Sequence, residues 1–171
     1  MLQNWAIQEF KEQISYRLDE SSRMLELCLR HLSEEDMWYR PNASSNTIAN
    51  LMLHLCGNIR QYAISSLGEQ ADTRQRDEEF STTGGFTKSE LWNKLQMTIA
   101  EAKTVMEAAS DEQMLRKRMV QGFELSGIGI LLHITEHYSY HTGQIALTTK
   151  LLKNGDLGFY ADLDLNTKNE G

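Results

Sequence analysis

The sequence predicts an all-α protein, a four-helix bundle with short extra helices and loops. Apolar residues recur at helical spacing over four long stretches. A single proline (Pro41) and eleven glycines among 171 residues leave room for long helices. The remaining runs are too short for a strand-rich fold. Because a chain of this length is short for two domains, we expect one domain over residues 1–171.

The first predicted helix runs from Trp5 to about Leu32. Charged residues fill the face opposite its apolar positions. Those positions are Ile7, Phe10, Ile14, Leu18, Leu25, Leu29 and Leu32. Ser33 is suited to cap a short helical piece that Pro41 closes, because acidic residues occupy the first turn after it.

The second predicted helix begins after the capping residues of segment 42–47 and ends at Gly68. Residues 69–86 are polar and finish in two glycines, so they form the longest predicted loop. A loop of that length in a compact domain often lines a functional site.

The third predicted helix opens with the capping box formed by Thr87 and Glu90, and it runs to about Ala109. Ser110 with Gln113 is able to start another helical turn. We expect residues 119–125 to be extended, since Gly122 argues against a continuous helix.

The fourth predicted helix covers residues 128–153 and ends at Asn154-Gly155. The tail that follows begins with aromatic residues and finishes polar. We expect its first part to dock on the bundle and its end to fray.

Composition favours a cytoplasmic protein. The formal net charge of −7 gives no basic footprint, so we expect neither nucleic acid nor a membrane surface as a partner. The N-terminus lacks the pattern of a signal peptide, and no stretch has about 18 consecutive apolar residues. Cys28 and Cys56 lie within apolar helical patterns, which favours two buried thiols in a reducing compartment.

Three histidines lie four residues apart in the fourth predicted helix, at His133, His137 and His141. At about 100° per residue, His137 and His141 fall within the apolar stripe, whereas His133 lies at its edge. Two imidazoles inside a bundle repel each other when charged and are costly when left unpaired. A shared metal ion would resolve this conflict, because neutral imidazole nitrogens are good ligands.

A pair of histidines at this spacing is weak evidence when it stands alone, and ordinary core or surface histidines are the alternative. A third ligand on another helix would strengthen the metal hypothesis. His54 is the candidate, since it lies on the flank of its helix beside Asn58. His31 ends the first helix, where it suits the helix dipole better than a metal.

Together these motifs resemble the DinB/YfiT-like metal-binding four-helix bundles. The resemblance rests on His54 in "LMLHLCGNIRQY", followed by "HYSYHTGQIALTTKLL" with His137, His141, Gly143 and Gln144. It extends from the N-terminal helix to Lys153, and the "QRDEEF" segment is similar to an uncharacterised bacterial branch of the family.

The resemblance implies that His54, His137 and His141 bind one divalent ion, most often zinc or nickel, with iron or manganese as further options. It also implies open coordination positions filled by water, and assembly as homodimers. Family members of known activity are thiol-dependent S-transferases or isomerases. By resemblance, the metal would hold a low-molecular-weight thiol, of the bacillithiol type, as a thiolate against an electrophilic small molecule.

Three protein nitrogens with an open position are typical of catalytic rather than structural zinc. The expected function is therefore that of a metal-dependent hydrolase or thiol S-transferase. The alternative is a non-catalytic metal- or ligand-binding stress-response protein whose metal is structural. No residue in the sequence stands out as an additional acid or base.

Several residues are candidates for supporting roles. Asn58, Arg60 and Gln144 are expected to orient a ligand or to bind substrate. Arg60, Arg74 and Arg76 are candidates for neutralising substrate carboxylates, although arginines in an acidic protein more often form surface ion pairs. Gly143 is expected to allow a close approach by another helix or a ligand. Glu136 is not expected beside His137, since it lies about 100° away on the helix.

Overall fold

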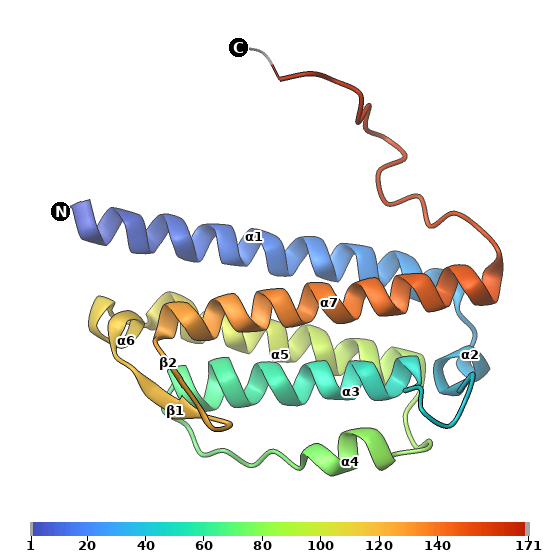
Figure 1. Ribbon diagram of the computed structural model, residues 1–171, viewed down its shortest axis with the longest axis horizontal. Coiled ribbons are helices and arrows are strands. Elements are labelled where there is room, and N and C mark those ends of the chain that lie inside the picture. Colours follow the sequence, from blue (N-terminus) through green and yellow to red (C-terminus); the bar gives the residue numbers. More distant parts are fainter. Residues whose placement is uncertain (1, 170–171) are drawn as a thin grey trace.

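Four long helices lie side by side in the computed structural model, which describes residues 2–169. They are α1 (Leu2–His31), α3 (Ile48–Ile59) with its continuation η1 (Arg60–Leu67), α5 (Lys88–Ala108) and α7 (Gly127–Lys153). Figure 1 shows α7 between α1 and α3, with α5 behind. The predicted all-α bundle is confirmed.

Short elements fill the connections. They are α2 (Glu34–Trp38), α4 (Arg76–Ser81), α6 (Asp111–Leu115) and the antiparallel strands β1 (Arg118–Val120) and β2 (Phe123–Leu125). Gln121 and Gly122 make the hairpin turn with positive φ angles, and the expectation of an extended segment at residues 119–125 is confirmed.

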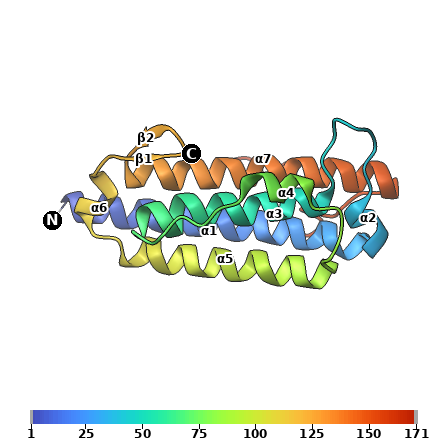
Figure 2. The ribbon, with the colours of Figure 1, turned by 90° about the horizontal axis from the view of Figure 1, so that it is seen from below.

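The expectation that residues 69–86 form only a loop is wrong. Asp77, Glu78 and Glu79 occupy the first turn of α4, where carboxylates are favoured by the helix dipole. Figure 2 shows α4 lying along α3 on the outside of the bundle. Asn50 of α3 fixes this position, since its side-chain amide donates to the carbonyls of Glu79 (3.0 Å) and Thr82 (2.8 Å).

Capping residues set where the helices begin. Ser33, Thr47, Thr87 and Ser110 each accept a hydrogen bond from the third residue of the helix that follows. In each case that third residue returns a bond to the backbone of the cap, which completes a capping box. The predicted starts at residues 33, 87 and 110 are thereby confirmed.

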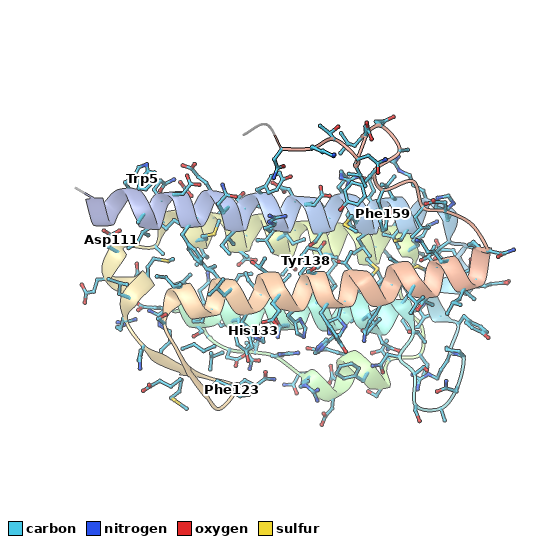
Figure 3. The ribbon with its side chains drawn as sticks, turned by 45° about the horizontal axis from the view of Figure 1, so that its top comes forward. Trp5, Asp111, Phe123, His133, Tyr138 and Phe159 are labelled. Atoms are coloured by element: carbon cyan, nitrogen blue, oxygen red, sulfur yellow. The ribbon has the colours of Figure 1, made fainter. Side chains whose placement is uncertain are left out.

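Aliphatic side chains from all four long helices make the core. Leu25 of α1, Leu55 of α3, Leu95 of α5 and Ile145 of α7 are fully buried. Tyr138 points from α7 toward α1 (Figure 3), where its hydroxyl lies 3.1 Å from the Ser22 hydroxyl. Cys28 and Cys56 are buried free thiols, as the sequence predicted.

The second long helix departs from the regular α-helix that its sequence predicted. Its last two turns are π-helical: Gly68 N–H donates to the Ala63 carbonyl and Gln70 N–H donates to the Ser65 carbonyl. This wider winding accommodates one extra residue and often accompanies functional sites.

The tail after α7 turns back toward α1 (Figure 1). Leu157 is buried, and Arg23 of α1 donates to the Phe159 carbonyl at 2.9 Å, which confirms a docked first part. None of the helices between residues 2 and 169 combines the length and apolarity needed to cross a bilayer.

Candidate metal centre

Three histidine side chains from two helices meet between α3 and α7. The Nε2 atom of His137 lies 3.1 Å from Nε2 of His54 and 3.2 Å from Nε2 of His141. All three donor atoms lie within 4.8 Å of one another, close enough to hold one metal ion. His54 and His141 are buried and His137 is half-buried, so the group opens to the surface beside His137.

Glu79 of α4 orients the His54 ring. Its Oε2 atom lies 2.8 Å from Nδ1 of His54, and both side chains are 9% exposed. An ionised carboxylate only accepts hydrogen bonds, so Nδ1 carries a proton, and in the neutral ring Nε2 then presents a lone pair to the other histidines. This carboxylate–histidine arrangement is the one that fixes ring orientation and tautomer in protein metal sites.

Arg74 holds the Glu79 carboxylate in place. Its Nε atom donates to Oε1 at 2.7 Å and Nη2 donates to Oε2 at 2.9 Å, with only 3% of the arginine side chain exposed. Burial alone would raise the pKa of Glu79, but the bonds from Arg74 and His54 lower it below its ordinary value. The carboxylate therefore stays ionised at neutral pH.

Gly57 makes the approach of Glu79 to α3 possible. A Cβ atom at this position would lie 1.9 Å from Oε1 of Glu79. Every other residue type would therefore displace the carboxylate or the α4 segment that carries it.

Gln144 orients the His141 ring. Its Oε1 atom lies 2.7 Å from Nδ1 of His141, one turn further along α7. An amide oxygen accepts, so the proton lies on Nδ1 and a second Nε2 lone pair points into the group. Burial lowers the pKa of His141, which keeps the ring neutral.

His137 lies between the other two rings. Burial and the neighbouring imidazoles lower its pKa to about 3. Its Nδ1 atom is buried and has no hydrogen-bond partner among residues 2–169. One proton on Nε2 of His137 would satisfy only one of the two lone pairs that face it. Without a further cation, one Nε2 atom of the three histidines therefore lacks a hydrogen-bond partner.

A divalent cation fits this arrangement. Metal–nitrogen bonds of about 2.0–2.1 Å at tetrahedral angles place ligand nitrogens roughly 3.3 Å apart, close to the two short separations seen here. The donor set of three neutral imidazoles suits zinc, nickel and iron(II). The residues therefore fit a metal, and His54, His137 and His141 are the ones that would hold it.

A second polar group adjoins the three histidines on the side of α7 that faces α3 and the hairpin (Figure 3). The His133 ring stacks on Tyr62 of η1, with centroids 3.9 Å apart and planes inclined by 19°. Asn58 donates from Nδ2 to Nε2 of His133 at 3.1 Å, while its buried Oδ1 has no partner within the described chain.

The angular argument from the sequence placed His133 outside the metal group, and its ring nitrogens contribute to none of the close Nε2 pairs. Asn58 was expected to support a ligand. The structure instead places it against His133, about one helical turn from His54.

Several candidates lie away from the histidines. Arg60 pairs with Glu101 of α5 at 2.6 Å, so the structure does not bring it to the site. Arg76 lies over the Phe80 ring, 5.0 Å from its centroid. Glu136 is exposed, as expected. The close approach expected at Gly143 is not seen, since nothing in the described chain lies within 4 Å of an added Cβ atom.

The role of Glu79 was missed at the level of sequence, and Arg74 was given a different one. The acidic run within the "QRDEEF" segment was the available signal. The sequence does not show which side chain a carboxylate in a polar segment will bind. Glu79 meets His54 only because α4 packs on α3.

Comparisons with known proteins agree with this fold. Residues 6–161 match the family described as "Protein of unknown function (DUF1572)". No curated protein matches the sequence significantly.

Two solved structures show the same architecture. One is a conserved protein from Enterococcus faecalis, with a TM-score of 0.70 and 17% identity, covering 84% of this chain and 97% of that one. The other is a DinB-like protein, YjoA, from Bacillus subtilis, with a TM-score of 0.64 and 19% identity, covering 86% and 96%. The chain belongs to the DUF1572 family, and it shares the fold of the DinB-like protein YjoA.

Proposed function

We propose that this protein is a divalent-metal-dependent enzyme that acts on small molecules, as a thiol S-transferase or a hydrolase. The observation that supports the proposal is the convergence of three Nε2 atoms. Two of them present lone pairs in the neutral rings, because Nδ1–H of His54 donates to Glu79 and Nδ1–H of His141 donates to Gln144. Zinc or nickel is the proposed ion, and iron or manganese is compatible with the same donors.

The open side of the site supports a catalytic role. A divalent ion held by the three imidazoles would supply a Lewis acid, which lowers the pKa of a bound thiol or water toward neutrality. The chain's own residues divide the remaining tasks. Glu79 and Gln144 hold protons on His54 and His141, while His133, Asn58 and Tyr62 offer polar contacts to a substrate beside His137.

Metal content tests the first part of the proposal. We expect about one divalent ion per chain by elemental analysis of the purified protein. His54→Ala, His137→Ala and His141→Ala are expected to lose it, whereas His133→Ala keeps it because its ring lies outside the Nε2 group. Equal loss from His133→Ala would contradict the assignment.

Turnover tests the second part. The metal-loaded protein is assayed with low-molecular-weight thiols and electrophilic acceptors, and separately with hydrolysable esters and amides. We expect activity that disappears in His137→Ala and on chelation. Full metal loading without turnover on either substrate set would argue against the enzyme.

A structural metal in a non-catalytic, stress-responsive binding protein is the second candidate. The buried positions of His54 and His141 favour it, because an ion there would tie α3 to α7. In that case chelation would sharply lower the melting temperature, and the metal-loaded wild type would show no turnover on either substrate set.

A homodimer and a cytoplasmic location complete the proposal. Two buried free cysteines agree with a reducing compartment. The outer face of α7 carries an exposed apolar stripe, made by Leu132, Tyr140, Leu147 and Leu151. Gly143 lies near its middle with open space around it, so a two-fold axis there would place Tyr140 opposite Leu147 of the partner subunit.

Light scattering after size exclusion tests the dimer. We expect twice the chain mass of 19.6 kDa for the wild type and a monomer for Leu147→Glu. Leu115→Glu, an exposed leucine on α6, is the matched control and should stay dimeric. A monomeric wild type would contradict this part of the proposal alone.

A further inference from the structure

The only run of three consecutive basic residues in this acidic chain is Arg116-Lys117-Arg118. It opens the β hairpin and lines a pocket of about 460 Å³ between β1, η1 and the segment that follows η1. The other polar side chains of the pocket come from Gln61, Ser65, Ser66, Gln70, Asp72 and Gln121.

Two of the three cations already have counter-charges. Arg116 pairs with Glu69, and Lys117 pairs with Glu124 at 3.2 Å on the exposed side of the hairpin. Asp72, the acidic group of the pocket, accepts from Gln61 Nε2 (2.7 Å) and from the Arg74 backbone N–H (3.1 Å). Each of its two oxygens therefore has one donor within the protein.

Arg118 is different, because its guanidinium meets no carboxylate in the described residues. Nη2 donates to the Gln113 carbonyl at 2.6 Å, while Nε and Nη1 are buried without any acceptor. Burial and the neighbouring charge of Arg116 both lower the pKa of Arg118, so the protein around it disfavours the cation. Buried arginine donors normally have partners, and an oxyanion matches their planar fork best.

We infer that this pocket is an oxyanion-binding subsite in which Arg118 receives the carboxylate or phosphate of a small acidic molecule. The geometry links the subsite to the histidines by two routes. Gln121 accepts from the Tyr62 hydroxyl at 3.0 Å, and Tyr62 stacks on His133. Gln61 accepts from Nη1 of Arg74 at 2.8 Å, the arginine that holds Glu79.

The spacing fits one ligand that spans both sites. His54 and Gln61 are seven residues apart on one continuous helix, which is roughly 10 Å along its axis. A molecule at least that long would be needed to bring an acidic end to Arg118 and a reactive group beside His137. This last step rests on the proposed function, whereas the oxyanion subsite does not.

The experiment is calorimetric titration of the purified full-length chain with inorganic phosphate and with succinate. We expect saturable binding of at least one probe. The probe that binds more tightly shows whether the subsite prefers a phosphate or a carboxylate. Arg118→Met should weaken binding by about 10- to 100-fold, as expected for a lost charge-assisted hydrogen bond. Arg30→Met is the matched control, since it removes an equal charge from an exposed ion pair on α1 and should leave binding unchanged.

His137→Ala separates this subsite from the metal centre. Binding that persists in this variant and disappears in Arg118→Met supports the subsite even if no metal is ever found. Binding lost in His137→Ala would show that the anion sits on the metal, and it would overturn the inference. No binding by either probe, or equal binding by Arg118→Met and Arg30→Met, would overturn it as well.

Amide spectra of the wild type keep the test independent of how Arg118→Met folds. We expect the anion-induced shifts to concentrate in residues 61–72 and 116–121. Shifts centred on residues 133–144 instead would contradict the subsite.

Discussion

At the scale of single residues, the site is defined by which ring nitrogen holds a proton. Nδ1–H of His54 donates to Glu79 and Nδ1–H of His141 donates to Gln144, and this leaves Nε2 of both neutral rings free to face His137. Neither partner is a ligand, yet together they determine what the three imidazoles can bind. Such outer partners typically change metal affinity by 10- to 100-fold when they are lost.

Glu79→Gln should therefore weaken metal binding by about 10- to 100-fold without removing a ligand. The amide keeps the volume but leaves Arg74 without its counter-charge. Competition with a fluorescent chelator measures the affinity. Glu78→Gln, an exposed neighbour on α4, is the control and should match the wild type.

Gly57→Ala provides an independent test of the same carboxylate. Its methyl group would overlap Oε1 of Glu79 and push the carboxylate away from His54. We expect a loss of metal affinity similar to that of Glu79→Gln, although no polar atom has been changed. Wild-type affinity in Gly57→Ala would show that Glu79 is dispensable for the site.

At the scale of elements, α4 acts through its attachment to α3. Asn50 is fully buried, and its side-chain amide donates to the carbonyls of Glu79 and Thr82. Its Oδ1 atom also accepts from the Thr47 cap, so a single side chain begins α3 and positions α4.

Asn50→Ala should lower the free energy of unfolding by about 3 kcal/mol, because it leaves a buried carbonyl, a partly buried carbonyl and a cap unpaired. Amide exchange in residues 76–82 is expected to accelerate more than exchange in α1. Denaturant unfolding and exchange measurements give the two values. Asn93→Ala, on the exposed face of α5, should change neither.

The elements with a long run of apolar residues at helical spacing were predictable, and so were the short helices that begin at a capping residue, whereas α4 was not. The four long helices and the starts at Ser33, Thr87 and Ser110 follow from local sequence. The angular positions that placed His137 and His141 on the inner side of their helix follow from it as well. Six residues are too few to show a period, so α4 was read as loop. The π-helical turns of η1 and the stacking of Tyr62 on His133 depend on contacts between helices, which no local pattern encodes.

At the scale of the whole molecule, the buried histidines link stability to pH. Burial lowers the pKa of His133, His137 and His141 in the folded chain below the ordinary value of 6.5. Below pH 6.5 the unfolded chain therefore binds protons that the folded chain does not. The free energy of unfolding consequently decreases as the pH is lowered.

For the metal-free chain, His137 alone should cost about 1.5 kcal/mol of stability between pH 6.5 and pH 5. Urea unfolding at steps of half a pH unit would measure the slope. His137→Leu should reduce the slope, because the histidine with the largest pKa shift is gone while His133 and His141 remain. A stability that stays constant over this window would mean that the rings are hydrated and charged in the folded chain.

The π-helical turns of η1 have a consequence for how this bundle tolerates changes in length. A wide turn is an insertion that a helix has absorbed, so the extra residue lies downstream of His54 and Asn58 and leaves their register untouched. Removing one residue between Ala63 and Leu67 would let the helix rewind tightly. Because such a deletion removes only the absorbed residue, the segment that carries Arg74 back to Glu79 would keep its direction. The wide last turns of η1 thus allow one continuous helix to contribute His54 to the histidine group at one end and to contact the hairpin at the other.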